Sequence, residues 1–195
     1  MIRNNLLDNN YNFERKLPNK WLVSMLWTFL CLIFLSASFG IFILATINTP
    51  INAPEKLYLT DFGILPHIII FSGIPFIYYG LKLRMTSSFC DKKKENMSVK
   101  MTDDGVPVFT CKEALKTWQI ILIHTIPAVL AYSALCAVIL SVAFDAHCII
   151  LLFLAAFVVA YDFALVICVL FMNARYKPDY IAVNRHVYDM TLFTK

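Results

Sequence analysis

The chain has 195 residues, of which 59% are hydrophobic and 15% are charged, and its mean hydropathy is +0.68. These values lie outside the usual range of soluble domains and predict an integral membrane protein with one membrane domain over residues 1–195. The net charge of +4 and the pI of about 8.7 do not indicate nucleic-acid binding, because the basic residues are scattered along connecting segments.

The N-terminal segment, residues 1–20, is polar and contains four basic residues, so it is predicted to be a cytoplasmic arm. Residues 21–47 form an apolar run longer than the ~20 residues needed to span the hydrocarbon core, with Trp21 at the interface. A cleaved signal peptide with a cleavage site at Ser36-Ala37-Ser38 is the alternative. The run continues past this site without a polar break, which favours a first transmembrane helix.

The next apolar run, residues 64–83, follows a short outer loop at 48–63 and predicts the second transmembrane helix. Pro75 lies in the middle of this run and is expected to kink the helix and free a backbone carbonyl. Residues 84–116 form the longest polar segment and are predicted to be a cytoplasmic loop. Two β-prone runs on either side of Asp103-Asp104-Gly105 predict a small β-hairpin within it.

The last two apolar runs predict the third and fourth transmembrane helices, at 117–143 and 149–173, joined by an outer connector at 144–148. A capping-box pattern predicts that the third helix begins at Cys111, before it enters the membrane. Residues 174–195 are predicted to be a cytoplasmic tail that adds a strand or short helix to the loop hairpin.

These segments predict an all-α, four-helix transmembrane bundle. In this topology 16 of the 17 Lys and Arg residues lie on the side of the arm, the long loop and the tail, with Lys82 at the end of the second helix counted as part of the loop. By the positive-inside rule that side is the cytoplasm, so both termini are predicted to be cytoplasmic. The expected location is the cell membrane, either an inner or a plasma membrane.

The strongest candidate for a functional residue is Asp162, the only acidic residue within an apolar run. A carboxylate inside a bilayer costs roughly 2.5 to 3.5 kcal/mol on insertion scales, so it indicates a functional site. His124 lies at a similar depth in the third helix, which raises the hypothesis of a proton or ion relay between the two side chains.

Small residues spaced four apart argue against that relay. Such stripes are typical of closely packed membrane helices, and the two stripes are expected to face each other. At about 100° per residue, Asp162 and His124 then lie opposite the stripes on their own helices and cannot meet. Asp162 is therefore expected to face Ser72, near Pro75, or another protein. The stripes consist of Ser133, Ala137 and Ser141 in the third helix and Ala156, Ala160 and Ala164 in the fourth.

No signature of an enzyme, a metal site or a cofactor site is found in the sequence. Motifs such as HExxH, GxSxG, the P-loop and GxGxxG are missing. The His67 and His147 side chains at the outer face lack metal-ligand spacing. The six cysteines show no paired spacing, so Cys90 and Cys111 are expected to be free thiols.

The composition favours a non-enzymatic protein that acts by binding within the bilayer. It would be an accessory or assembly subunit of a membrane complex, or an immunity-type protein against a membrane-active toxin. Its expected partners are the lipid bilayer and another membrane protein or a second copy of itself. The alternative is a small oligomeric transporter or channel that uses Asp162.

Overall fold

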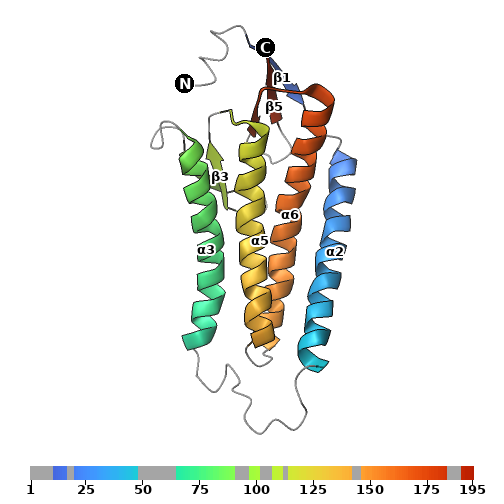
Figure 1. Cartoon of the computed structure of the whole chain (residues 1–195), viewed down its shortest axis with the longest axis vertical. Helices are drawn as coiled ribbons and strands as arrows, with labels where there is room; N and C mark the ends of the chain where they lie inside the picture. The colour runs from blue at the N-terminus through green and yellow to red at the C-terminus, as the bar shows by residue number, and fades with distance from the viewer. Residues whose placement is uncertain are drawn as a thin grey trace.

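The fold is mostly helical, with four long helices side by side and small β-sheets at one end (Figure 1). The computed structural model describes residues 11–16, 20–47, 65–90, 97–101, 107–111, 114–141, 146–183 and 190–195. The helices are α2 (Lys20–Ile47), α3 (Leu65–Phe89), α5 (Thr117–Ser141) and α6 (Ala146–Tyr176). Each of the four predicted helical segments thus corresponds to a helix.

Three helices are long and apolar enough to cross a membrane: α2, α5 and α6 contain such spans at Trp21–Ala45, Thr117–Ile139 and Ile150–Tyr176. A helix suits these sequences because it satisfies all backbone hydrogen bonds within one segment, as hydrocarbon requires. The chain is therefore a membrane-embedded protein.

Helix α3 continues to Phe89 and does not end at residue 83 as predicted. Hydroxyl groups in its last turns donate hydrogen bonds to backbone carbonyls one turn earlier, including Thr86 Oγ1 to the Lys82 carbonyl at 2.7 Å and Ser88 Oγ to the Arg84 carbonyl at 2.9 Å. The segment counted as the start of a loop is thus the final part of a helix. Lys82 thus lies about two turns before the end of a helix that packs against α5.

The start of α5 also differs from the prediction. Cys111 is the last residue of a strand, and Leu115 exchanges two backbone hydrogen bonds with Ile181, so the chain is still extended there. The N–H of Lys116 donates to Gln119 Oε1 at 2.8 Å, which is half of a capping box. The helix therefore begins at Thr117, six residues later than the predicted start at Cys111.

The end of α6 has a local cause in the sequence. Lys177 has φ of 46°, and its N–H donates to the Asn173 carbonyl at 2.9 Å, which is a left-handed helix cap. Pro178 follows and cannot donate the next helical hydrogen bond. The helix thus ends at Tyr176, three residues beyond the predicted boundary.

The predicted hairpin is confirmed. Strands β2 (Met97–Met101) and β3 (Pro107–Cys111) pair antiparallel, with Met97 opposite Cys111 and Met101 opposite Pro107. The pair forms a sheet of its own, so the tail does not extend it, contrary to the prediction.

A second sheet joins the arm to the tail. Strands β1 (Asn12–Lys16), β4 (Tyr180–Val183) and β5 (Met190–Thr194) form an antiparallel sheet in the order β1-β5-β4. Alternate residues of β5 are buried on opposite sides: Met190 and Leu192 pack against the bundle, and Phe193 packs in a small outer cluster. The fold is therefore not purely α-helical, and part of the predicted arm is a strand.

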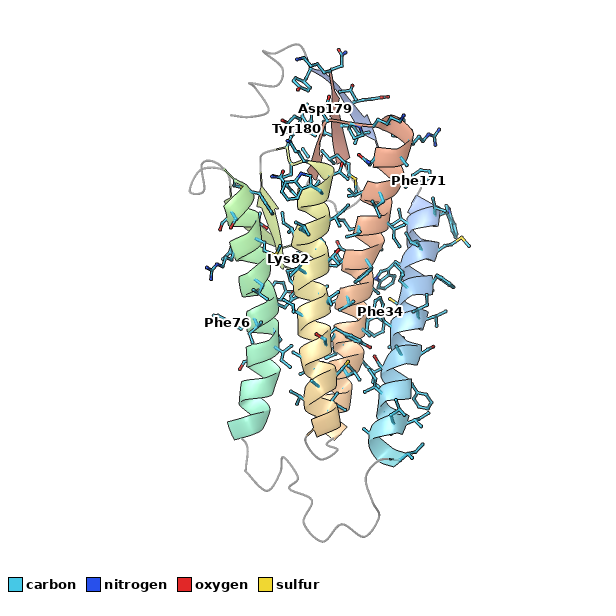
Figure 2. The ribbon with its side chains drawn as sticks, viewed as in Figure 1. Phe34, Phe76, Lys82, Phe171, Asp179 and Tyr180 are labelled. Atoms are coloured by element: carbon cyan, nitrogen blue, oxygen red, sulfur yellow. The ribbon has the colours of Figure 1, made fainter. Side chains whose placement is uncertain are left out.

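Helix α6 packs against both α5 and α2, and α3 packs against the other side of α5. The Phe34 ring of α2 lies between α2 and α6, 5.5 Å from the Phe163 ring and 5.7 Å from the Tyr132 ring (Figure 2). In contrast, Phe76 of α3 is 79% exposed and points away from the other helices (Figure 2). Aromatic side chains thus fill the centre of the bundle and also cover its outer surface.

Candidate functional site

Four ionisable side chains from three helices meet around one carboxylate in the interior of the bundle. Asp162 of α6 is fully buried. Its Oδ1 lies 2.7 Å from Lys82 Nζ and 2.7 Å from His124 Nδ1, and its Oδ2 accepts a short hydrogen bond from the Tyr78 hydroxyl. We call Tyr78, Lys82, His124 and Asp162 the Asp162 cluster.

Helix α3 contributes two members of the cluster because Tyr78 and Lys82 are four residues apart and so lie on one face of the helix. Lys82 Nζ also donates to the Tyr78 hydroxyl at 3.0 Å and lies 5.2 Å from the centre of its ring. Figure 2 shows Lys82 between α3 and α5, on the half of the bundle nearer the sheets. The tyrosine and the lysine therefore contact each other as well as the carboxylate.

The ion pair between Lys82 and Asp162 is shielded from solvent. The lysine side chain is 12% exposed and the aspartate side chain 1% exposed. An ionised Asp162 has only acceptor atoms, so the neutral His124 ring must carry its proton on Nδ1 and donate it. With Lys82 protonated, the charges of the cluster sum to zero. The carboxylate thus has three hydrogen-bond donors from within the chain, and one of them, Lys82, is also its counter-ion.

The prediction that Asp162 and His124 cannot meet is wrong, because the small-residue stripes do not face each other. Ala156, Ala160 and Ala164 are fully buried on α6, but Ser133 and Ala137 are exposed on α5. The side chain of Ser141 lies outside the described part of the structure. The α5 positions that are buried are Ile120, Ile123, Pro127, Ala128, Ala131, Leu135 and Ile139.

The helix that contains Pro75 does supply partners for Asp162, although not the expected ones. Ser72 is exposed, and the hydrogen bonds recorded for Asp162 within the described part of the chain come from other side chains. The partners are Tyr78 and Lys82, which lie two to three turns farther along α3. Helix α3 is continuous through Pro75. Its continuity does not test the kink, which stays a prediction.

Sequence reasoning missed both Tyr78 and Lys82. Lys82 lies at the end of an apolar run and was counted with the cations of the following loop. The usable signal was Asp162 itself, because a buried carboxylate needs a cation at similar depth and Lys82 is the one basic residue within the four predicted apolar runs.

A second buried polar contact joins α2 to α5 farther from the sheets. Ser38 is fully buried, and its Oγ donates to the Phe34 carbonyl at 2.7 Å. The same Oγ lies 2.7 Å from the Tyr132 hydroxyl oxygen. Among the described residues, every buried side-chain nitrogen or oxygen has a hydrogen-bond partner. Helix α2 runs unbroken through the candidate signal cleavage site, Ser36-Ala37-Ser38.

The prediction of free thiols is wrong for Cys90, which is disulfide-bonded. Cys31, Cys136 and Cys168 are free, in agreement with their positions in apolar runs. Cys90 directly follows α3 at the end of the bundle that carries the sheets. Disulfides are typical of oxidising compartments, so this bond favours the orientation opposite to the one that the basic residues predict.

Within the described residues, no group of three or more His, Cys, Asp or Glu side chains could hold a metal ion. The side chains of His67 and His147, considered above as outer-face metal ligands, lie outside the described part of the structure. The Asp162 cluster offers one carboxylate whose oxygens are already bonded to a cation and two further donors. Each of the four side chains in the cluster can bind or release a proton.

Comparisons with known proteins identify no relative of this chain: family models, curated proteins and solved structures each give no match.

Proposed function

We propose that this chain is a small membrane protein that moves protons across the bilayer through Asp162. One observation carries the proposal: Tyr78, Lys82 and His124 all direct donor atoms at the Asp162 carboxylate in the interior of the bundle. Ionisable groups inside membrane proteins are rare, and chains of Asp, Glu and His are the parts from which proton relays are built.

The charge balance of the cluster explains why a proton would matter there. With Asp162 ionised and Lys82 protonated, the cluster is neutral. Adding one proton to the carboxylate leaves the lysine cation without its counter-ion, in surroundings where charges interact much more strongly than in water. Protonation of Asp162 therefore weakens the link between α3 and α6. This gives a way to couple proton binding to a movement of α3.

We also propose that α3 is the fourth membrane span. Strand β1 precedes α2 and strand β5 follows α6, and these strands pair directly, with Asn12 opposite Thr194. Both ends of the helical region must then lie on the same side of the membrane, so the chain crosses an even number of times. Since α2, α5 and α6 are candidate spans, α3 supplies the crossing that makes the number even.

The distribution of basic residues supports an orientation with the sheets in the cytoplasm, because 15 of the 17 Lys and Arg residues belong to segments on that side. The Lys82 side chain lies inside the bundle and is not counted among these residues. The Cys90 disulfide opposes this orientation. We adopt the orientation given by the charges because it depends on many residues along the chain rather than on one bond.

Proton movement can be measured directly in vesicles. Purified protein is reconstituted with a pH-sensitive dye inside, a membrane potential is imposed, and internal pH is followed. We expect proton flux with the native protein and with Asp179→Asn, which removes an exposed carboxylate outside the bundle. Asp162→Asn, which has nearly the same shape but cannot ionise, should give the flux of empty vesicles. Equal flux with Asp162→Asn and native protein would refute the proposal, as would no flux with native protein.

A second candidate function is binding within the bilayer, as an accessory subunit or an immunity-type protein. The observation that favours it is the outer surface of α2, where Trp21, Phe29 and Phe39 are 80%, 62% and 54% exposed. Lipid or another membrane protein must cover this surface. Purification from membranes in mild detergent tests this function, because recovery of the chain alone as a monomer would contradict it.

A further inference from the structure

The two nitrogens of the His124 ring have different surroundings. Nδ1 faces the buried Asp162 Oδ1 at 2.7 Å. No buried polar side-chain atom of the described residues lacks a partner, and the hydrogen bond that His124 makes to those residues runs through Nδ1. Nε2 therefore belongs to the accessible 14% of this side chain, whereas Asp162 is 1% exposed. The ring thus separates the carboxylate from the outside of the bundle.

The position of His124 along α5 places it near water at the end of the bundle with the sheets. It lies seven residues, or about 10 Å, beyond Thr117, where the helix begins. Thr117 Oγ1 donates to Asn173 Oδ1 at 2.9 Å, so polar groups occupy that end of the α5–α6 pair. The Trp118 side chain is 51% exposed, as expected of a residue at the membrane–water interface. His124 thus lies about two turns below the interface.

We propose that His124 is the relay that delivers protons to Asp162 from the end of the bundle with the sheets. This inference rests on the proposed function and adds the route by which the carboxylate is reached. A proton binds to Nε2 of the neutral ring and produces an imidazolium ion. The proton on Nδ1 then passes to Asp162 Oδ1, which leaves a neutral ring protonated on Nε2 and a protonated carboxyl group. The ring thus gains one proton at Nε2 and loses one from Nδ1, so the cluster as a whole gains one proton, which is bound to Asp162.

The groups around His124 favour onward transfer of the proton. Asp162 from α6 contacts the ring directly, and Lys82 and Tyr78 from α3 bond to the same carboxylate. Lys82 Nζ bonds to the same carboxylate oxygen as His124, so an imidazolium ion and the ammonium group would repel each other at close range. Passing the proton to the carboxylate removes the charge from the ring.

Two substitutions at His124 separate proton relay from hydrogen bonding. In His124→Asn the side-chain amide lies close to the position of Nδ1 and can donate to Asp162, but it cannot take up a proton at one atom and release another. In His124→Ala the ring is removed and leaves space for free imidazole. We expect both variants to lower the proton flux in the vesicle assay about a hundredfold, and added imidazole to restore flux to His124→Ala only.

The outcomes of this experiment separate the relay from the proposed function. If Asp162→Asn abolishes flux while His124→Asn retains the native rate, the relay is wrong and proton movement through Asp162 stands. If Asp162→Asn retains flux, the proposed function fails. In that case the carboxyl infrared band, followed after a rapid drop in pH, still tests the relay. Slower protonation of Asp162 in His124→Asn than in native protein supports it, and equal rates overturn it. Size-exclusion chromatography in detergent must show folded monodisperse protein for each variant compared.

Discussion

Replacing Lys82 by methionine should strongly destabilise the bundle, because it leaves the Asp162 charge buried without a counter-ion. The two charged groups are 2.7 Å apart, which corresponds to an attraction of about 6 kcal/mol at an effective dielectric constant of about 20. The cost of removing both charges from water offsets much of this attraction, and the loss of one partner of a buried pair typically costs about 3–5 kcal/mol. We expect Lys82→Met to lower the free energy of unfolding by that amount.

The double variant Lys82→Met, Asp162→Asn supplies the critical comparison. It removes both charges while the asparagine can still accept hydrogen bonds, so its stability should return to near that of native protein. Unfolding by sodium dodecyl sulfate in mixed micelles, followed by tryptophan fluorescence, measures all variants. Arg84→Met, an exposed cation on the same helix, is the control and should have little effect. A double variant as unstable as the sum of the two single variants would refute the ion pair.

Three further predictions concern other contacts. Ser38→Ala should lower the free energy of unfolding by about 1 kcal/mol, because the hydroxyl bonds to a tyrosine of α5; Ser133→Ala, at an exposed site, should not. Phe193→Ala should cost about 3–5 kcal/mol because the ring is fully buried in the β1-β5-β4 sheet, whereas Phe171→Ala, 52% exposed, should cost little; equal melting temperatures would contradict this. Cys90 should resist alkylation in cells quenched with acid until a reductant is added, because it is disulfide-bonded, and labelling of Cys90 without a reductant would contradict this bond.

The helices and the hairpin could be predicted because their signals are local. Long apolar runs determine the four helices, and the two β-prone runs around Asp103-Asp104-Gly105 determine β2 and β3. Both kinds of element satisfy their backbone hydrogen bonds among residues close in sequence. Boundaries were wrong where a distant residue decided them: Leu115 stays extended because it pairs with Ile181, which delays the start of α5.

The cluster could be predicted only in part, because its formation depends on how each helix is rotated about its axis. Asp162 stood out as the acidic residue in an apolar run, and His124 was recognised as lying at similar depth. The pattern of small residues then gave the wrong rotation for α5, because Ser133 and Ala137 face outward while larger residues pack on α6. In lipid, unlike in water, an apolar side chain is stable on either face of a helix, so hydrophobicity does not indicate which face is buried.

The pairing of β1 with β5 has a consequence for the order in which the protein is made and folded. β5 is the central strand, so neither β1 nor β4 has a partner in this sheet until β5 is present. In the chain β5 comes after all four helices, and Phe13 must wait for Phe193, 180 residues later, before it can pair. Membrane insertion of the helices therefore precedes closure of the sheet, and β1 must remain on the side where it was left. The sheet can close only when both ends of the helical region lie in the same compartment.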